Sequence, residues 1–240
     1  MTQLRLHPRS LSLFFSGAVG FVTDKHLVER YYGVPSRDRS IEFLIEQSSR
    51  LNLRVISNFQ ERRSLVTKTE QYTNYSGVFC TCKGIVNQWL SELASANFFL
   101  ALPGGYMLMC HNLIEAMAVG TIPVLSYEDW LAPTLVHGQN CLTYRTLEEL
   151  PALIDTINQM DQSAIAKMRQ AVIDYYDRYL SPDNIAQFLR SYQGAQLHLF
   201  INHEDAETLK NVIDTSVLQQ GGTLQNQLRP LTQNLTQNRV

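Results

Sequence analysis

The segment FFLALPGGYMLMCHNLIEAMAVGTIPVLS, residues 98–126, contains the pattern of a strand, a turn, a helix and a second strand. The apolar run Phe98 to Leu102 has the length of a strand and ends at the turn-forming Pro103-Gly104-Gly105. Helical periodicity extends from Met107 to Val119, and the glycine that follows occupies a favoured C-cap position. Ile122 to Leu125 is again of strand length. A strand–helix–strand unit predicts neighbouring parallel strands in an α/β protein.

Three polar side chains interrupt the apolar surface of this helix: His111, Asn112 and Glu115. Their spacing of three and four residues places them on one side of the helix. A carboxylate on a largely buried helix needs hydrogen bonds or a cation to offset its desolvation. Glu115 therefore either makes a structural contact, to His111 or to an arginine elsewhere, or faces a cleft and accepts hydrogen bonds from two neighbouring hydroxyls of a ligand.

Apolar runs of strand length recur on both sides of this unit, at residues 11–16, 53–57, 98–102, 122–125 and 141–144. Helical periodicity lies between them at residues 41–51 and 85–94, and residues 60–77 form a polar surface excursion. Strands that alternate with helices predict a Rossmann-like, doubly wound parallel sheet with helices on both faces.

The C-terminal part of the chain is predicted to be helical and then irregular. Two helices are expected over residues 147–179, divided near Asp161, and another over 184–192. An edge strand at 197–201 and a helix at 205–215 follow, and the polar tail from Gln219 is expected to be disordered or loosely attached. These boundaries divide the chain into a domain at 1–192, an extra strand and helix within 193–218, and a tail at 219–240.

Composition narrows the classes of function. The net charge of −2 argues against general nucleic-acid binding, which needs a basic surface. Cys80, Cys82, Cys110 and Cys141 form neither a disulfide framework nor a zinc-ligand pattern, so we expect reduced thiols. No Asp-x-Asp pair follows a strand, so we expect no bound divalent metal and no cofactor.

The N-terminal segment could be mistaken for a signal peptide, because an apolar run follows Arg5 and Arg9. The run is short and contains Ser12 and Ser16, which favours a first strand. No apolar run is long enough to span a bilayer. We therefore expect a cytoplasmic protein that reaches a membrane, if at all, through a partner.

Several short motifs resemble, in the same order, the nucleotide-sugar half of the exostosin-like glycosyltransferases. Along the chain they are Leu13-Phe14-Phe15-Ser16-Gly17, residues 93–100, Pro103-Gly104-Gly105-Tyr106, Glu115-Ala116-Met117, Gly120-Thr121-Ile122-Pro123-Val124 and residues 126–133. A Glu-Ala-Met sequence followed by Gly-x-x-Pro-Val also occurs in other two-domain glycosyltransferases. The resemblance implies one Rossmann-like half of the two-domain GT-B fold.

The resemblance also implies a binding site for a nucleoside-diphosphate sugar. Glu115 would bind the ribose, and the backbone amides after Pro103, in the turn that includes Tyr106, would approach the nucleotide. Gly104 and Gly105 would permit that approach because neither has a Cβ. His111 and Asn112, on the same side of the helix as Glu115, are further candidates for contacts with the ligand.

Two arginines and one aspartate complete the candidate site. Arg37 and Arg39 lie between the first strand and the next helix, where doubly wound domains bind phosphate. Either they stabilise a diphosphate or they are solvated residues of an exposed first helical turn. Asp129 follows the strand at 122–125, and it either contacts the sugar or caps the turn before Pro133.

The sequence departs from the family pattern at two positions where the family has arginine. Cys110-His111-Asn112 stands where the family has Ser-x-Arg, and Gly104 replaces the arginine of a Pro-Arg-Gly turn. Two cations expected near a diphosphate are therefore missing. Either other residues supply that charge, or donor binding is altered or lost.

The length of the chain leaves three hypotheses. The resemblance ends near Tyr192, and no second Rossmann-like domain for an acceptor fits in 240 residues. In the first hypothesis, the chain is the donor-binding half of a glycosyltransferase of polysaccharide biosynthesis. Such an enzyme would transfer a sugar to a glycan or other acceptor with the help of a partner chain. The alternatives are a catalytically inactive nucleotide-binding fragment and an α/β protein-interaction domain. No residue of the chain can be nominated as the catalytic base.

Overall fold

The computed structural model describes residues 2–20, 26–82, 84 and 86–193. The strand expected at 197–201, the helix expected at 205–215 and the tail from Gln219 lie outside the described residues.

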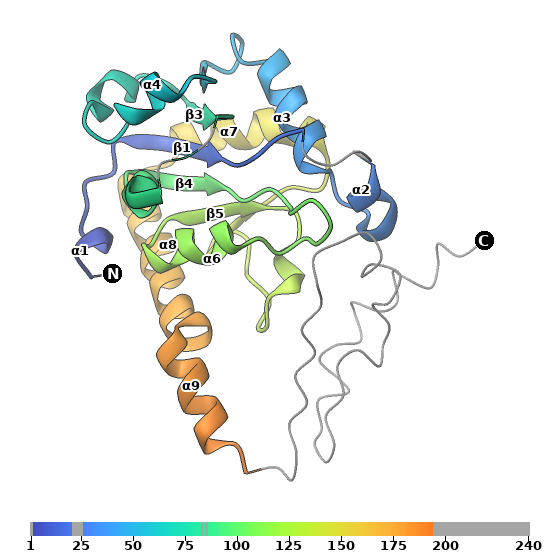
Figure 1. Cartoon of the computed structure of the whole chain (residues 1–240), viewed down its shortest axis with the longest axis vertical. Helices are drawn as coiled ribbons and strands as arrows, with labels where there is room; N and C mark the ends of the chain where they lie inside the picture. The colour runs from blue at the N-terminus through green and yellow to red at the C-terminus, as the bar shows by residue number, and fades with distance from the viewer. Residues whose placement is uncertain (1, 21–25, 83, 85, 194–240) are drawn as a thin grey trace.

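A parallel sheet forms the centre of the described fold (Figure 1). Its six strands lie side by side in the order β2-β3-β1-β4-β5-β6, and every neighbouring pair is parallel. The strands are β1 (Leu11–Ser16), β2 (Leu53–Ile56), β3 (Gly77–Cys80), β4 (Ala96–Leu100), β5 (Ile122–Leu125) and β6 (Leu142–Thr143). The predicted Rossmann-like α/β fold is therefore confirmed.

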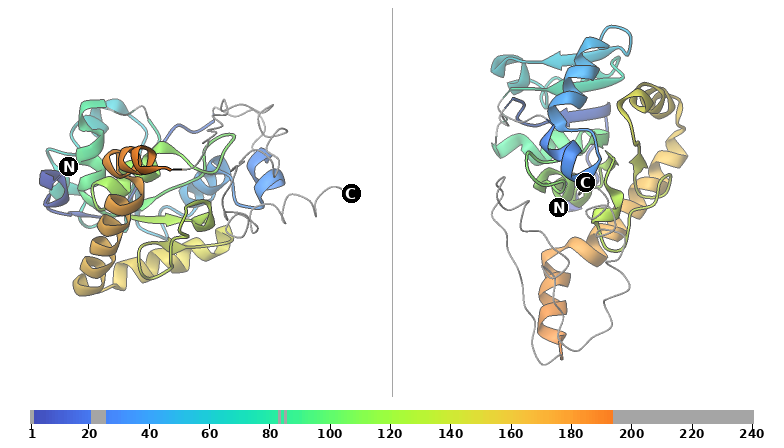
Figure 2. Two further views of the ribbon diagram at one scale, coloured as in Figure 1. Left: turned by 90° about the horizontal axis from the view of Figure 1, so that it is seen from below. Right: turned by 90° about the vertical axis from the view of Figure 1, so that its right-hand side faces the viewer.

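Helices cover both faces of this sheet. In the right-hand view of Figure 2, α5 and α6 (green) lie on one side of the sheet and α7 (yellow) on the other. Contacts agree, since α5 packs on β4, α6 on β5, and α7 on β1. The helices are α1 (Thr2–Arg5), α2 (Leu27–Tyr32), α3 (Arg37–Glu46), α4 (Phe59–Arg63), α5 (Trp89–Ala94), α6 (His111–Ala118), α7 (Leu150–Gln159), α8 (Gln162–Tyr175) and α9 (Pro182–Ser191).

Strand β1 is the central strand and marks a change of direction in the sheet. The chain passes from β1 to the edge strand β2, returns through β3 beside β1, and then crosses to β4 on the other side. The connection after β1 leads to one side of the sheet and the connection after β4 to the other, and open α/β sheets bind ligands at the carboxyl ends of the strands at such a point. Phe14 and Phe15 of β1 are fully buried, so the strand is anchored in the core on both faces.

The structure differs from the predicted elements in several places, and β4 lies two residues earlier than the predicted 98–102. Strand β3 was not predicted, because its apolar run, Val78 to Cys80, has only three residues and follows a glycine at the end of a polar segment. Helix α6 begins at His111, not Met107, because Cys110 has an extended backbone and the Gly104 N–H is bonded to Leu108. Helix α3 spans Arg37–Glu46, earlier than the predicted 41–51, because Ser36 caps its first turn through a bond from the Arg39 N–H.

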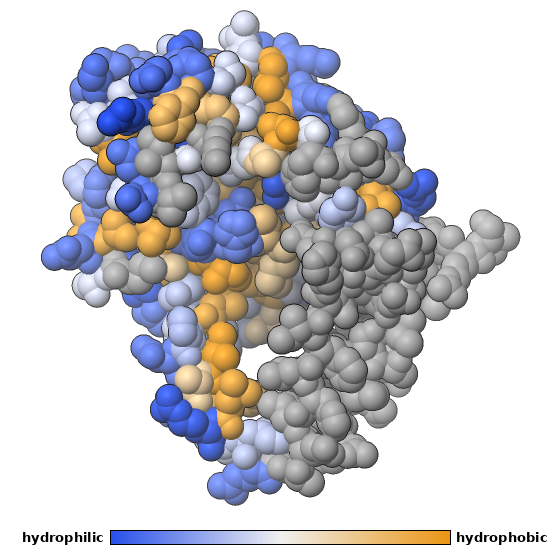
Figure 3. Space-filling view, in the orientation of Figure 1, coloured by the Kyte–Doolittle hydropathy of each residue, from blue (hydrophilic) through white to orange (hydrophobic). Residues whose placement is uncertain are grey.

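The C-terminal helix α9 extends away from the body of the fold (Figure 1). None of its residues is buried, and Ile185, Phe188 and Leu189 are exposed. Figure 3 shows these apolar residues along the protruding helix. Among the described residues, no helix has the length and apolar character required to cross a membrane.

Candidate functional site

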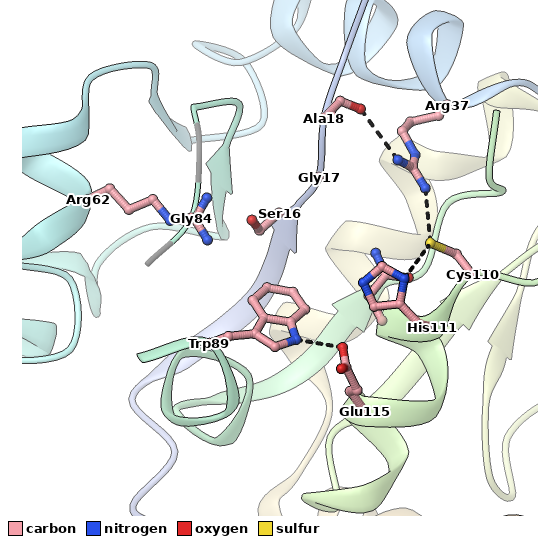
Figure 4. Close-up of a pocket in the computed structure, with 11 residues that line it drawn as sticks. Ser16, Gly17, Ala18, Arg37, Arg62, Gly84, Trp89, Cys110, His111 and Glu115 are labelled. Carbon is pink, nitrogen blue, oxygen red and sulfur yellow. Dashed lines mark hydrogen bonds between the residues drawn. The ribbon is translucent and has the colours of Figure 1, made fainter. Parts of the chain in front are cut away.

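A cavity of about 390 Å³ opens at the carboxyl end of β1 (Figure 4). It lies where the connections after β1 and β4 lead to opposite sides of the sheet. Helices α3, α4 and α5 each contribute one lining residue, and α6 contributes three. Its lining consists of Ser16, Gly17, Ala18, Arg37, Arg62, Gly84, Trp89, Cys110, His111, Asn112 and Glu115. The structure thus brings together four predicted site residues: Arg37, His111, Asn112 and Glu115.

Glu115 faces this cavity from the middle of α6. Its Oε2 accepts a hydrogen bond from Nε1 of Trp89, at 2.6 Å. Among the described residues it forms no ion pair and no bond to His111, so neither structural contact expected from the sequence is present. The indole occupies one acceptor position of the carboxylate. A carboxylate has about four such positions, so acceptor capacity remains for a ligand.

Arg37 supplies positive charge to the wall of the cavity opposite Glu115. It is the first residue of α3 and is buried, so it is not a solvated residue of an exposed helical turn. Its Nε donates to the Pro103 carbonyl at 2.9 Å, while its Nη1 donates to the Ala18 carbonyl at 3.4 Å. These bonds hold the guanidinium between the loop after β1 and the loop after β4.

Arg62 is a second cation at the cavity, and sequence reasoning missed it. The segment 60–77 was predicted to be a surface excursion, yet Arg62 is 1% exposed and its Nη2 lies 2.6 Å from Oε2 of the fully buried Glu92. Burial by itself lowers the pKa of this guanidinium, but the hydrogen bond and charge of Glu92 outweigh burial and raise it. Gly84 makes room for it, since a Cβ there would lie 2.9 Å from Nη2. Thirty residues separate the ion pair, so no local pattern could have revealed it.

The first residues of α6 form the floor between these two cations. Cys110 immediately precedes the helix, and its Sγ accepts a hydrogen bond from Nη2 of Arg37 at 3.4 Å. Nδ1 of His111 lies 3.8 Å from the same sulfur. Asn112 is 5% exposed, and its Oδ1 has no hydrogen-bond partner among the described residues. The site therefore combines donors, an open carboxylate and a helix N-terminus, which favours anionic ligands with hydroxyl groups.

Five other candidate residues do not line the cavity. Gly104 and Gly105 are buried in the loop before α6, and the carbonyl of Tyr106 accepts a hydrogen bond from Tyr32. Gly104 and Gly105 therefore do not share this cavity with Glu115, contrary to the prediction. Arg39 points to Glu29, with both Oε atoms 2.8 Å from its Nη1.

Asp129, the remaining candidate, is exposed in the short 3₁₀ turn Glu128–Trp130. It makes no side-chain hydrogen bond that would cap the turn before Pro133 among the described residues, and it lies outside the cavity lining. Its neighbour Glu128 is the buried carboxylate of this turn and pairs with Arg145.

No protein-family model matches the chain, and no curated protein sequence is significantly similar to it. Only the short sequence motifs resemble the exostosin-like glycosyltransferases.

Proposed function

We propose that the cavity binds the nucleoside diphosphate of a sugar donor, and that the chain is the donor-binding half of an exostosin-like, GT-B-type glycosyltransferase. The observation that carries the proposal is the open carboxylate of Glu115. It has one neutral partner, it faces a cavity at the change of direction in a parallel sheet, and it stands opposite a buried arginine. A ribose has two neighbouring hydroxyls, and both can donate hydrogen bonds to such a carboxylate.

The diphosphate would lie towards the start of α6. Arg37 and the N-terminus of this helix favour negative charge at that end of the cavity, while Arg62, at the other wall, is paired with Glu92. These two arginines come from different elements than the two family arginines that the sequence lacks. In this proposal Arg37 supplies part of the charge that the two missing family arginines would have given.

Sugar transfer also needs an acceptor and a group that activates it. We assign neither to this chain, and propose that a second domain or partner chain supplies the acceptor side. In this proposal the described residues bind the donor and stabilise the leaving diphosphate electrostatically.

Calorimetric titration with UDP, GDP, ADP, CDP and dTDP tests the proposal. We expect one of them to bind, and Glu115→Gln to weaken that binding. Glu46→Gln is the matched control, because Glu46 is an exposed glutamate on α3 that lies outside the cavity lining. If none of the five nucleotides binds, the chain is an interaction domain and the proposal is wrong.

The catalytically inactive alternative is separated by a second measurement. A donor-binding half that retains function should release nucleoside diphosphate from the matching nucleotide sugar when extracts containing acceptor and partner are added. Binding without release under any such condition would favour an inactive nucleotide-binding fragment.

A further inference from the structure

Cys110 occupies a different environment from the other three cysteines. Cys80 and Cys141 are fully buried, and burial raises the pKa of each thiol to about 12. Cys82 is partly buried and packs against the hydrophobic core. Cys110 is partly exposed and lines the cavity directly before the first residue of α6.

A guanidinium, an imidazole and a helix N-terminus surround the Cys110 sulfur. Nη2 of Arg37 donates to Sγ at 3.4 Å, and the N–H groups at the start of α6 add their partial positive charge. Nδ1 of His111, at 3.8 Å, is placed to exchange a proton with the thiol. Partly exposed cysteines beside cations and at helix N-termini are the ones that react, because the thiolate is the nucleophile.

Asn112 indicates, independently of Cys110, that the cavity accommodates a hydrogen-bond donor. Its side chain lines the same cavity and is 5% exposed, and its Oδ1 lacks a donor among the described residues. A buried acceptor left unsatisfied costs free energy, so a ligand with an O–H group that enters would be favoured. A peroxide and a cysteine sulfenic acid both carry such a group.

We infer that Cys110 is a modification site inside the cavity, where its thiol reacts with a peroxide to form a sulfenic acid. The thiol first loses its proton, and the sulfur then attacks one peroxide oxygen. An S–O bond forms, the O–O bond breaks, and the leaving hydroxide or alkoxide takes up a proton to give water or an alcohol. The sulfur loses two electrons and the peroxide gains them, so no further reactant is required.

A consequence for ligand binding rests on the proposed function. The added oxygen lies next to the Nη2 of Arg37 and at the start of α6, where the diphosphate is proposed to bind. Oxidised Cys110 would therefore compete with the diphosphate for the same donors.

The order of thiol reactivity in the full-length native protein tests the inference. The protein is treated briefly with iodoacetamide at neutral pH, the remaining thiols are blocked with N-ethylmaleimide after denaturation, and peptides are quantified by mass spectrometry. We expect Cys110 to be alkylated at least about tenfold faster than Cys80 and Cys141. Equal or slower alkylation of Cys110 overturns the inference.

Sulfenic acid formation is measured in parallel with hydrogen peroxide and dimedone. We expect the dimedone adduct on Cys110, a slower reaction in His111→Gln, and an unchanged rate in His7→Gln, a histidine on the N-terminal segment away from the cavity. Labelling of another cysteine in place of Cys110 overturns the inference. Labelling of Cys110 is measured on the protein without substitutions, so it can be decided even if a variant fails to fold.

Nucleotide binding is then measured before and after peroxide treatment. If the nucleoside diphosphate binds in the cavity, it should slow Cys110 alkylation, and oxidised protein should bind it at least about tenfold more weakly. A reactive Cys110 in a protein that binds no nucleotide would overturn the proposed function and leave the modification site standing. Nucleotide binding with an unreactive Cys110 would overturn the modification site and leave the proposed function standing.

Discussion

Glu92 and Glu115 lie on neighbouring helices and have opposite environments. Glu92, on α5, is fully buried, and Nε and Nη2 of Arg62 donate to its two oxygens. Glu115, on α6, is partly exposed, has a neutral indole as its partner, and opens into the cavity. Glu92 uses its acceptor capacity within the fold, whereas Glu115 retains much of its own. The comparison separates a structural carboxylate from one available to a ligand.

The largest effect is expected when Glu92 loses its cation. In Arg62→Met the buried carboxylate keeps its desolvation cost without compensation, so the free energy of unfolding should fall by about 3–5 kcal/mol. Urea denaturation measures this change. Combining Arg62→Met with Glu92→Leu should recover part of the loss, because no buried charge then remains. A loss below about 1 kcal/mol in the single variant would show that Glu92 is not structural.

Substitution of Glu115 should affect binding more than folding. Each hydrogen bond to a charged group contributes ~1.5–3 kcal/mol, so Glu115→Ala should weaken nucleoside-diphosphate binding roughly tenfold to a few hundredfold. Glu115→Gln keeps one acceptor oxygen and should be milder, with a change in stability below about 1 kcal/mol. Calorimetry and melting temperature are measured on the same samples. Unchanged affinity with a lowered melting temperature would place Glu115 in the same structural class as Glu92.

The Trp89 indole should contribute a smaller effect by orienting Glu115. Trp89→Phe retains a ring to pack against Phe14 and Phe99 but removes the donor to Oε2. We expect nucleotide affinity to fall about two- to tenfold, the equivalent of one neutral hydrogen bond. In a Glu115→Gln background the same substitution should have less effect. Equal effects in both backgrounds would mean that Trp89 acts independently of Glu115.

The smallest effect is expected at an ion pair on the surface, between Arg5 and Asp177. The hydrogen bond from Arg5 outweighs partial burial and holds the pKa of Asp177 below its ordinary value of 3.8. The stabilisation is therefore present above pH 3.8 and is lost as the pH falls through the lower pKa of the folded state. Because the Asp177 side chain is 52% exposed, Asp177→Asn should cost only about 0.2–1 kcal/mol at neutral pH.

Urea denaturation at neutral pH and near pH 3 checks this prediction, with exposed Asp155→Asn as the control. The cost of Asp177→Asn should shrink at the lower pH. A cost that grows in acid would contradict the direction of the pKa shift.

The sequence predicted the sheet better than the site. Strands β1 and β5 lie where they were expected, because apolar runs bounded by polar or turn residues leave little ambiguity. Strand β3 escaped detection because it begins with Gly77 and its apolar run, Val78 to Cys80, has only three residues, fewer than a strand usually shows. The helices α7 and α8 were correctly divided near Asp161, whose side chain caps α8.

Local patterns located the residues of α6 in the cavity but not their partners. Helical spacing grouped His111, Asn112 and Glu115, whereas Trp89 and Arg62 arrive from distant segments and have no local signature there. Arg37 and Arg39 are two residues apart, yet α3 directs one into the cavity and the other to Glu29. Side-chain direction on a first helical turn depends on where that helix begins, and the predicted start was later than the actual one.

The central position of β1 also has a consequence for how the protein is made. Residues 11–16 leave the ribosome well before their partners on the two sides, residues 77–80 and 96–100. During that interval Leu13, Phe14 and Phe15 have no sheet to join, although each is almost completely buried in the final fold. Pairings this distant in sequence slow folding and prolong the exposure of apolar segments. A nascent chain that stalls before Phe98 should therefore present the apolar residues of β1 to chaperones.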